Sequence, residues 1–103
     1  MGRIFNSYQP ARRNGAQAFV SVTSSGSSDV QTLTPPPDAT ACFISCDGTD
    51  GRFTCDGATN PTATVGHILR AAMGAPIFLP MAVPLRWVST AGTAAVLQVT
   101  WLE

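Results

Sequence analysis

A chain of 103 residues with 12% charged side chains and a formal net charge of +0 has room for one domain and carries little charge. All six basic residues are arginine and only Arg12 and Arg13 are adjacent, so the clustered positive surface of a nucleic-acid-binding protein is missing. No apolar run approaches the ~18 residues of a membrane span, and no apolar segment follows the first residues as in a secretory signal. We expect a protein that binds neither nucleic acid nor membrane and whose low charge suits an assembly.

Residues 1–16 are interpreted as an extended N-terminal arm ahead of a single domain at 17–103. Pro10 interrupts any helix, and no hydrophobic period emerges before residue 17. Such an arm either covers the protein's own core or reaches a neighbouring protein. The residues expected at this interface are the apolar and basic side chains of the arm, Ile4, Phe5, Tyr8, Arg12 and Arg13.

Short alternating segments follow the arm, separated by turns rich in Gly, Ser and Pro. Alternation of apolar and polar residues places successive side chains on opposite faces of a strand. In the last segment, for example, Ala95, Leu97, Val99 and Trp101 share one face. The predicted strands cover residues 17–23, 30–34, 41–46, 52–55, 85–89 and 94–101, with a further apolar run at 76–80.

Two turns in this series predict hairpins. The Asp-Gly steps within 47–51 join the strands on either side of them, because glycine supplies the positive φ that tight hairpins need. Residues 90–93 turn the strand at 85–89 into the terminal strand, which puts Trp87 and Trp101 on neighbouring strands. Residues 64–74 can form either a short helix or a strand and loop, and the sequence leaves this open.

About seven or eight short strands at intervals near ~10 residues, with Gly/Pro turns, describe an all-β fold. We therefore predict a small β-sandwich or jelly-roll-like domain with an extended N-terminal arm.

The three cysteines are interpreted as free thiols. An odd number without a secretory signal argues against a disulfide framework, and Cys42 shares a strand face with Ile44 and Cys46. A zinc site made from these thiols, Cys55 and His67 matches no common finger spacing. A Cys46–Cys55 bridge across the predicted hairpin remains the other alternative.

The acidic residues are assigned to turns. Asp47, Asp50 and Asp56 lack the alternate spacing and distant glutamate of a calcium loop. No acid or nucleophile has a partner at a useful spacing, so we expect no metal, no cofactor and no enzymatic activity.

Two segments resemble proteins of one kind. Residues 55–67, CDGATNPTATVGH, are similar to the D-G-T-x-P-T-A-x-x-G stretch of small uncharacterised proteins encoded among the head genes of tailed bacteriophages. Residues 85–101, LRWVSTAGTAAVLQVTW, look like the terminal hairpin of those proteins, in which an R-x-I-S-x-S-G-T-A turn feeds a strand that ends in aromatics. Together the two segments cover less than half of the chain.

The resemblance implies a small β-sandwich in a virion, and a capsid decoration (cement) protein in particular. It implies that the partner is the major capsid protein or another virion protein, and that the chain forms a homo-oligomer, with a trimer preferred. No catalytic residues come with it. The alternatives are a tail, neck or baseplate component, or a sugar-binding or peptide-binding module that uses Tyr8 and Phe53.

Overall fold

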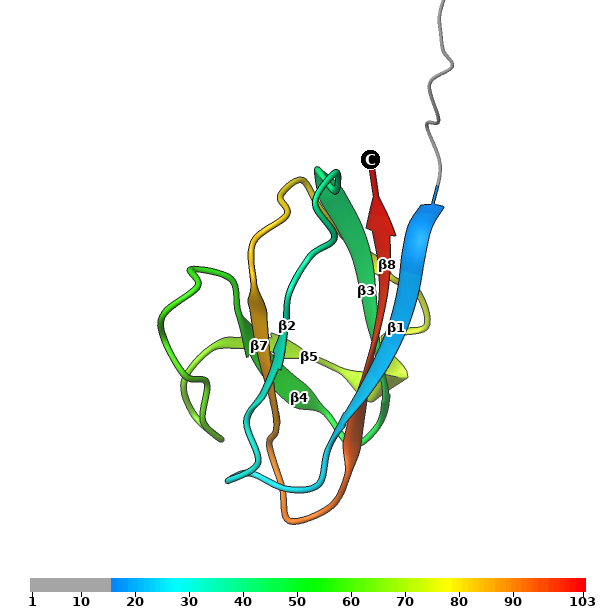
Figure 1. The fold of residues 1–103 in the computed structure, drawn as a ribbon. Coiled ribbons are helices and arrows are strands. Elements are labelled where there is room, and N and C mark those ends of the chain that lie inside the picture. Colours follow the sequence, from blue (N-terminus) through cyan, green and yellow to red (C-terminus); the bar gives the residue numbers. More distant parts are fainter. Residues whose placement is uncertain (1–15) are drawn as a thin grey trace, which may run out of the picture.

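The computed structural model describes residues 16–103, with side chains from residue 18 onward. Within this part the chain forms eight strands and one short 3-10 helix (Figure 1). The strands are β1 (Ala16–Ser24), β2 (Gln31–Leu33), β3 (Ala41–Gly48), β4 (Gly51–Thr54), β5 (His67–Leu69), β6 (Ile77–Leu79), β7 (Leu85–Ser89) and β8 (Ala95–Leu102), and the helix is η1 (Ala71–Met73).

The strands form two four-stranded antiparallel sheets. Sheet I has the order β1-β8-β3-β6, and sheet II has the order β2-β7-β4-β5. The first strand therefore pairs with the eighth, the second with the seventh, the third with the sixth and the fourth with the fifth. This order is that of a jelly roll. The prediction of an all-β sandwich is confirmed.

The core lies between the two sheets, where the inner faces of the strands meet. In β8 the alternation read from the sequence is confirmed, because Ala95, Leu97, Val99 and Trp101 are all buried and the residues between them are half-buried. Cys42 and Ile44 of β3 face the same core and are fully buried. Sequence alternation thus identified the inner face of sheet I.

Trp87 fills the core from the side of sheet II. Its ring is fully buried, and a Cβ added to Gly51 on the neighbouring strand would lie 2.1 Å from a ring carbon. The indole N–H donates a 3.1 Å hydrogen bond to the carbonyl oxygen of Ala95 in sheet I. One side chain therefore fixes the spacing of two strands and joins the two sheets.

Both predicted hairpins are wrong. β3 belongs to sheet I and β4 to sheet II, so residues 47–51 cross between the sheets. Residues 90–94 likewise carry the chain from β7 in sheet II to β8 in sheet I. Trp87 and Trp101 consequently lie on different sheets rather than on neighbouring strands of one hairpin.

The two crossings lie against each other and satisfy each other's polar groups. The Thr49 amide donates to the carbonyl oxygen of Ala94 (3.3 Å), and the carbonyl oxygen of Asp50 accepts from the amide (3.0 Å) and hydroxyl (2.9 Å) of Thr90. Gly48 does take the positive φ of +86° expected of a turn. The turn chemistry was therefore predicted, but not the sheet that the next strand joins.

The segment at 64–74 forms β5 and one turn of 3-10 helix. Gly66 and Gly74 adopt φ values of 116° and 81°, which interrupt a longer helix at both ends. Arg70 at the N-cap makes no side-chain capping bond. The short-helix alternative is thus reduced to a single 3-10 turn.

We expect Gly51→Ala to lower the free energy of unfolding by at least ~1–3 kcal/mol, the usual cost of overpacking a core, because the new methyl group would overlap the rigid Trp87 ring. Gly92→Ala is the matched control, since a Cβ there meets nothing within 4 Å. Urea unfolding followed by tryptophan fluorescence measures both. Equal stability of the two variants would contradict the packing described for Trp87.

Candidate functional site

The outer face of sheet II is covered by the loop of residues 55–66. Arg86 on β7 donates to the carbonyl oxygens of Ala58 (2.8 Å) and Gly57 (3.2 Å) and to Asn60 Oδ1 (2.6 Å). Arg52 on β4 donates to the carbonyl oxygens of residues 63 (3.0 Å) and 66 (2.8 Å). Two charged side chains that point away from the core therefore hold the loop against the sheet.

Apolar groups are enclosed between this loop and the sheet. Val88 is fully buried although it alternates with the core residues of β7, and Pro61 of the loop is also buried. A Cβ at Gly66 would lie 3.0 Å from the carbonyl oxygen of Phe53 and 3.2 Å from the Pro61 side chain. The loop thus forms a small second layer that covers much of this face, although Val65 of the loop and Ile68 of β5 stay 47% and 37% exposed.

Asp56 organises the start of the loop. Its carboxylate accepts hydrogen bonds from the Ala58 amide (2.9 Å), the Thr59 amide (2.8 Å) and the Thr59 hydroxyl (2.5 Å). These bonds, led by the Thr59 hydroxyl, lower the pKa of Asp56 from its ordinary value of 3.8 to about 2. Thr54 adds a bond to the carbonyl oxygen of Thr59 (2.5 Å). The carboxylate is therefore used to build a turn.

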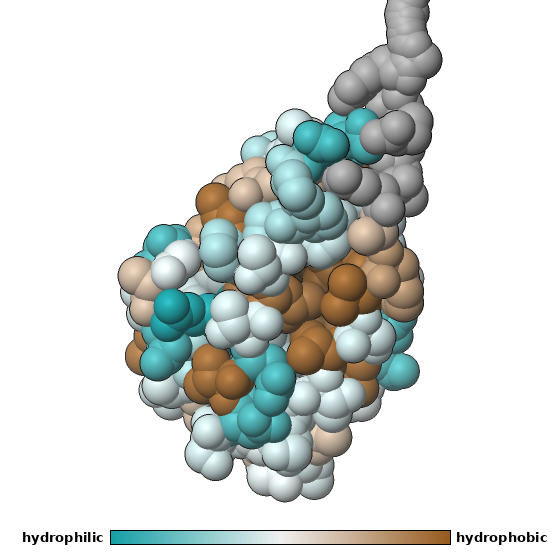
Figure 2. Space-filling view, in the orientation of Figure 1, coloured by the Kyte–Doolittle hydropathy of each residue, from teal (hydrophilic) through white to brown (hydrophobic). Residues whose placement is uncertain are grey.

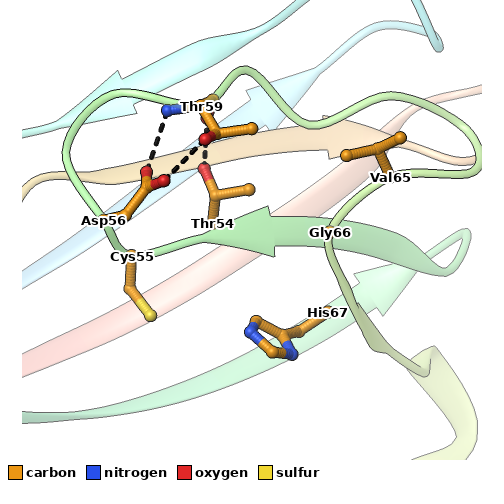
Figure 3. A pocket seen from close by; sticks show the side chains of 7 residues that line it. All are labelled: Thr54, Cys55, Asp56, Thr59, Val65, Gly66 and His67. Atoms are coloured by element: carbon orange, nitrogen blue, oxygen red, sulfur yellow. Dashed lines mark hydrogen bonds between the residues drawn. The ribbon is translucent and has the colours of Figure 1, made fainter.

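A hollow of about 430 Å³ lies beside this turn, lined by Thr54, Cys55, Asp56, Thr59, Val65, Gly66 and His67. Figure 3 shows the Asp56 and Thr59 side chains bonded to each other, whereas Cys55 and His67 point away from them. His67 packs its ring against Phe53, with 5.4 Å between ring centroids. The groups lining the hollow serve the loop and the sheet rather than forming a nucleophile and its base.

The cysteines do not form the alternatives considered from the sequence. All three are free thiols, so the structure contains no Cys46–Cys55 bridge. Burial raises the pKa of Cys42 and of Cys46 to about 11, and the thiols therefore stay protonated at neutral pH. Within residues 16–103, no group of three or more Cys, His, Asp or Glu side chains could hold a metal ion.

The outer face of sheet I is different, because it carries a bare row of aromatic side chains. Phe19 of β1 is in register with Thr100 of β8, which is in register with Phe43 of β3, and Phe43 is in register with Phe78 of β6. The three phenylalanines, which we call the aromatic row, are 62%, 39% and 50% exposed. Phe43 and Phe78 are in contact, with ring centroids 5.4 Å apart. The row has members on three of the four strands, with Thr100 of β8 between Phe19 and Phe43.

The surroundings of the aromatic row are uncharged. A hollow of about 280 Å³ lies along it, lined by Phe19, Phe43, Ser45, Pro76, Gln98 and Thr100. Figure 2 looks onto the edge of the sandwich and shows apolar surface beside β1, the strand that carries Phe19. Contiguous exposed apolar surface of this kind marks an interaction site more often than scattered single residues do. The outer face of sheet I is therefore the candidate functional site.

The residues predicted for an interface and those found on the surface are different sets. Ile4, Phe5, Tyr8, Arg12 and Arg13 lie outside the described residues. Phe53, the aromatic expected to be available to a sugar or peptide, is only 5% exposed and belongs to the core, so that expectation is wrong.

The aromatic row itself was missed by the sequence reasoning, although a signal for it exists. Phe43 stands between Cys42 and Ile44, and Phe19 stands between Ala18 and Val20, all apolar residues of alternating strands. A large aromatic on the opposite face of an alternating strand is the pattern that could have identified the row.

Comparisons with known proteins add no relative: no protein-family profile, curated protein or solved structure matches the chain. Within residues 16–103 there is no helix of the length and apolar character needed to cross a membrane.

We expect the turn at Asp56 to open in acid. Because the folded pKa of Asp56 is depressed to about 2, its contribution is complete above the ordinary value of 3.8 and is lost as the pH falls through about 2. The backbone amide shifts of Ala58 and Thr59, followed by NMR, should titrate with that low midpoint. Asp56→Asn should abolish the titration, whereas Asp38→Asn, at an exposed position, should leave it unchanged. A midpoint at or above 3.8 would contradict the bonding described.

Proposed function

We propose that the chain is a virion structural protein, a capsid decoration (cement) protein that binds the outside of a tailed-phage head through the outer face of sheet I. The observation that carries this proposal is the contrast between the two faces. Sheet II is largely covered by its own loop, held by Arg52 and Arg86. Sheet I leaves phenylalanines exposed on three of its four strands.

The chemistry of this face suits a permanent interface. Interface centres are depleted in charged residues and enriched in aromatics. Phenylalanine has few rotatable bonds, so its immobilisation costs less entropy than that of lysine or arginine. The absence of lysine from the whole chain and the uncharged lining of the hollow along the row support the same reading.

The fold and the sequence resemblance add independent support of different strength. Jelly rolls occur in viral capsid proteins, but also in lectins and cupins, so the fold alone does not select a function. The resemblance of residues 55–67 and 85–101 to phage head-gene proteins selects the virion among these classes. A tail, neck or baseplate role would use the same face on a different layer of the virion.

The partner in this proposal is the major capsid protein, and the protein itself is a homo-oligomer, with a trimer preferred. Sheet I can lie on a shell through its bare face while the loop-covered face of sheet II points outward. Local symmetry axes of a shell would bring copies together, and closed rings are the common form of such assemblies.

We expect the double variant Phe43→Ser/Phe78→Ser to bind shells of the major capsid protein about 100-fold more weakly than the natural protein, because two apolar anchors are removed from the interface. Cosedimentation with purified shells measures the affinity. Val65→Ser/Ile68→Ser is the matched control, since these apolar side chains, 47% and 37% exposed, belong to the loop and edge of sheet II.

Undiminished binding of the phenylalanine variant, with both variants folded, would contradict sheet I as the docking face. Equal weakening of both variants would mean that the protein binds shells by nonspecific hydrophobic association. Copurification of the protein with tails and not with heads would move the proposal from the head to another virion layer.

We expect the intact protein to sediment as an oligomer, and a trimer in particular, at micromolar concentration. Sedimentation equilibrium gives the mass directly. A monodisperse monomer that also fails to bind shells would remove the support for the cement proposal.

A further inference from the structure

The sequence contains three Asp-Gly pairs, at residues 47–48, 50–51 and 56–57. An aspartate before a glycine is open to a spontaneous change of the main chain, because glycine has no side chain to shield its amide nitrogen. That nitrogen attacks the aspartate Cγ, a carboxyl oxygen leaves as water, and a cyclic succinimide forms. Water then opens the ring, and opening at the original backbone carbonyl leaves the main chain running through the side-chain carboxyl, as isoaspartate. The water lost in the first step is regained in the second, so the reaction needs no other reagent.

Two of the three pairs have their carboxylates bound by other groups. The carboxylate of Asp50 accepts hydrogen bonds from the Ala71 amide (2.7 Å) and from Arg70 (3.3 Å). The carboxylate of Asp56 accepts the loop bonds described above, and these bonds, led by that from the Thr59 hydroxyl, lower its pKa to about 2. The succinimide forms from the uncharged acid, which a low pKa makes rarer. Both pairs are therefore protected by the fold.

The carboxylate of Asp47 is arranged differently. Asp47 and Gly48 are both exposed, at the end of β3. Within residues 16–103 the one hydrogen bond to the Asp47 carboxylate comes from the Gly48 amide, with 2.9 Å between the nitrogen and Oδ1. Cγ is bonded to that oxygen, so the two atoms that would join lie side by side. Reactions within one molecule gain rate when the reacting groups are held in contact.

We propose that Asp47-Gly48 is a site of spontaneous isoaspartate formation in the folded protein, and that the same dipeptide at 50–51 and 56–57 stays unchanged. The three pairs are chemically alike in the unfolded chain, because the same residue follows each aspartate. The fold separates them by what each carboxylate contacts. This inference concerns the domain itself and does not depend on the proposed virion role.

The modification acts on the contact between the two sheet crossings. Isoaspartate adds one carbon atom to the main chain between residues 47 and 48, in the part of β3 that pairs with β8. The next residue, Thr49, donates its amide to the carbonyl oxygen of Ala94 (3.3 Å), and its hydroxyl lies 2.7 Å from that of Thr93. An extra atom in one strand disturbs the register of the pair and displaces Thr49 from both groups. We therefore expect the protein to lose stability slowly as it ages.

The experiment stores the intact folded protein at neutral pH and follows each site with an endoprotease that cleaves before aspartate but not before isoaspartate. We expect cleavage before residue 47 to be lost progressively, while cleavage before residues 50 and 56 is retained. The same protein stored unfolded in guanidinium chloride is the control, because all three sites should then lose cleavage at similar rates. Retained cleavage before residue 47 in the folded protein would overturn the proposal, as would equal loss at all three sites.

A second measurement tests the effect on the fold. Asp47→Glu removes the site, because glutamate would have to close a larger ring. Asp38→Glu, at an exposed position followed by alanine, is the matched control. After storage, the urea midpoint of the natural protein and of Asp38→Glu should fall, and that of Asp47→Glu should stay at its fresh value. An equal fall in all three proteins, or no fall in any of them, would overturn the expected effect on the crossing.

Discussion

The indole ring of Trp87 is the contact on which the rest of the sandwich depends. The ring lies where a side chain at Gly51 would be, so β4 and β7 can be neighbours only because residue 51 has none. The indole N–H also bonds the carbonyl oxygen of Ala95 and thereby ties sheet II to sheet I in the core. Once this spacing is set, the alternation of β8 and β3 determines which side chains are buried, and the outward direction of Phe43 follows.

Within residues 16–103, most of the charged side chains hold the protein's own loops. Arg52 and Arg86 bind backbone oxygens of the loop over sheet II, and Asp56 binds amides within that loop. Asp50 accepts from the Ala71 amide (2.7 Å) and from Arg70 (3.3 Å), which anchors the 3-10 turn. Asp47, on the outer face of β3, is exposed, whereas the hollow along the aromatic row is lined by uncharged residues.

Alternation within strands was readable from the sequence because it reports burial directly. It gave the positions of β1, β3, β7 and β8 and the inner faces of β3 and β8. The sheet to which a strand belongs was not readable. The Asp-Gly turn before β4 has the same sequence whether the chain returns along β3 or crosses to the other sheet. The contact that favours the crossing joins residues 49–50 to residues 90–94, which are distant in sequence. Phe53 was misassigned for a related reason, since a four-residue strand alternates too briefly to show which face is buried. The loop held by two arginines left no periodic signal at all.

Within residues 16–103 β1 pairs with β8 alone, and this free edge and the bare face of sheet I share Phe19, so the two surfaces are continuous. A strand added beside β1 would cover the exposed flank of Val20 and continue the sheet on the side where the aromatic row ends. The surface of the sheet would then extend across five strands. One face of the added strand would cover Val20 at the edge of the core. The other face would widen the docking surface of sheet I.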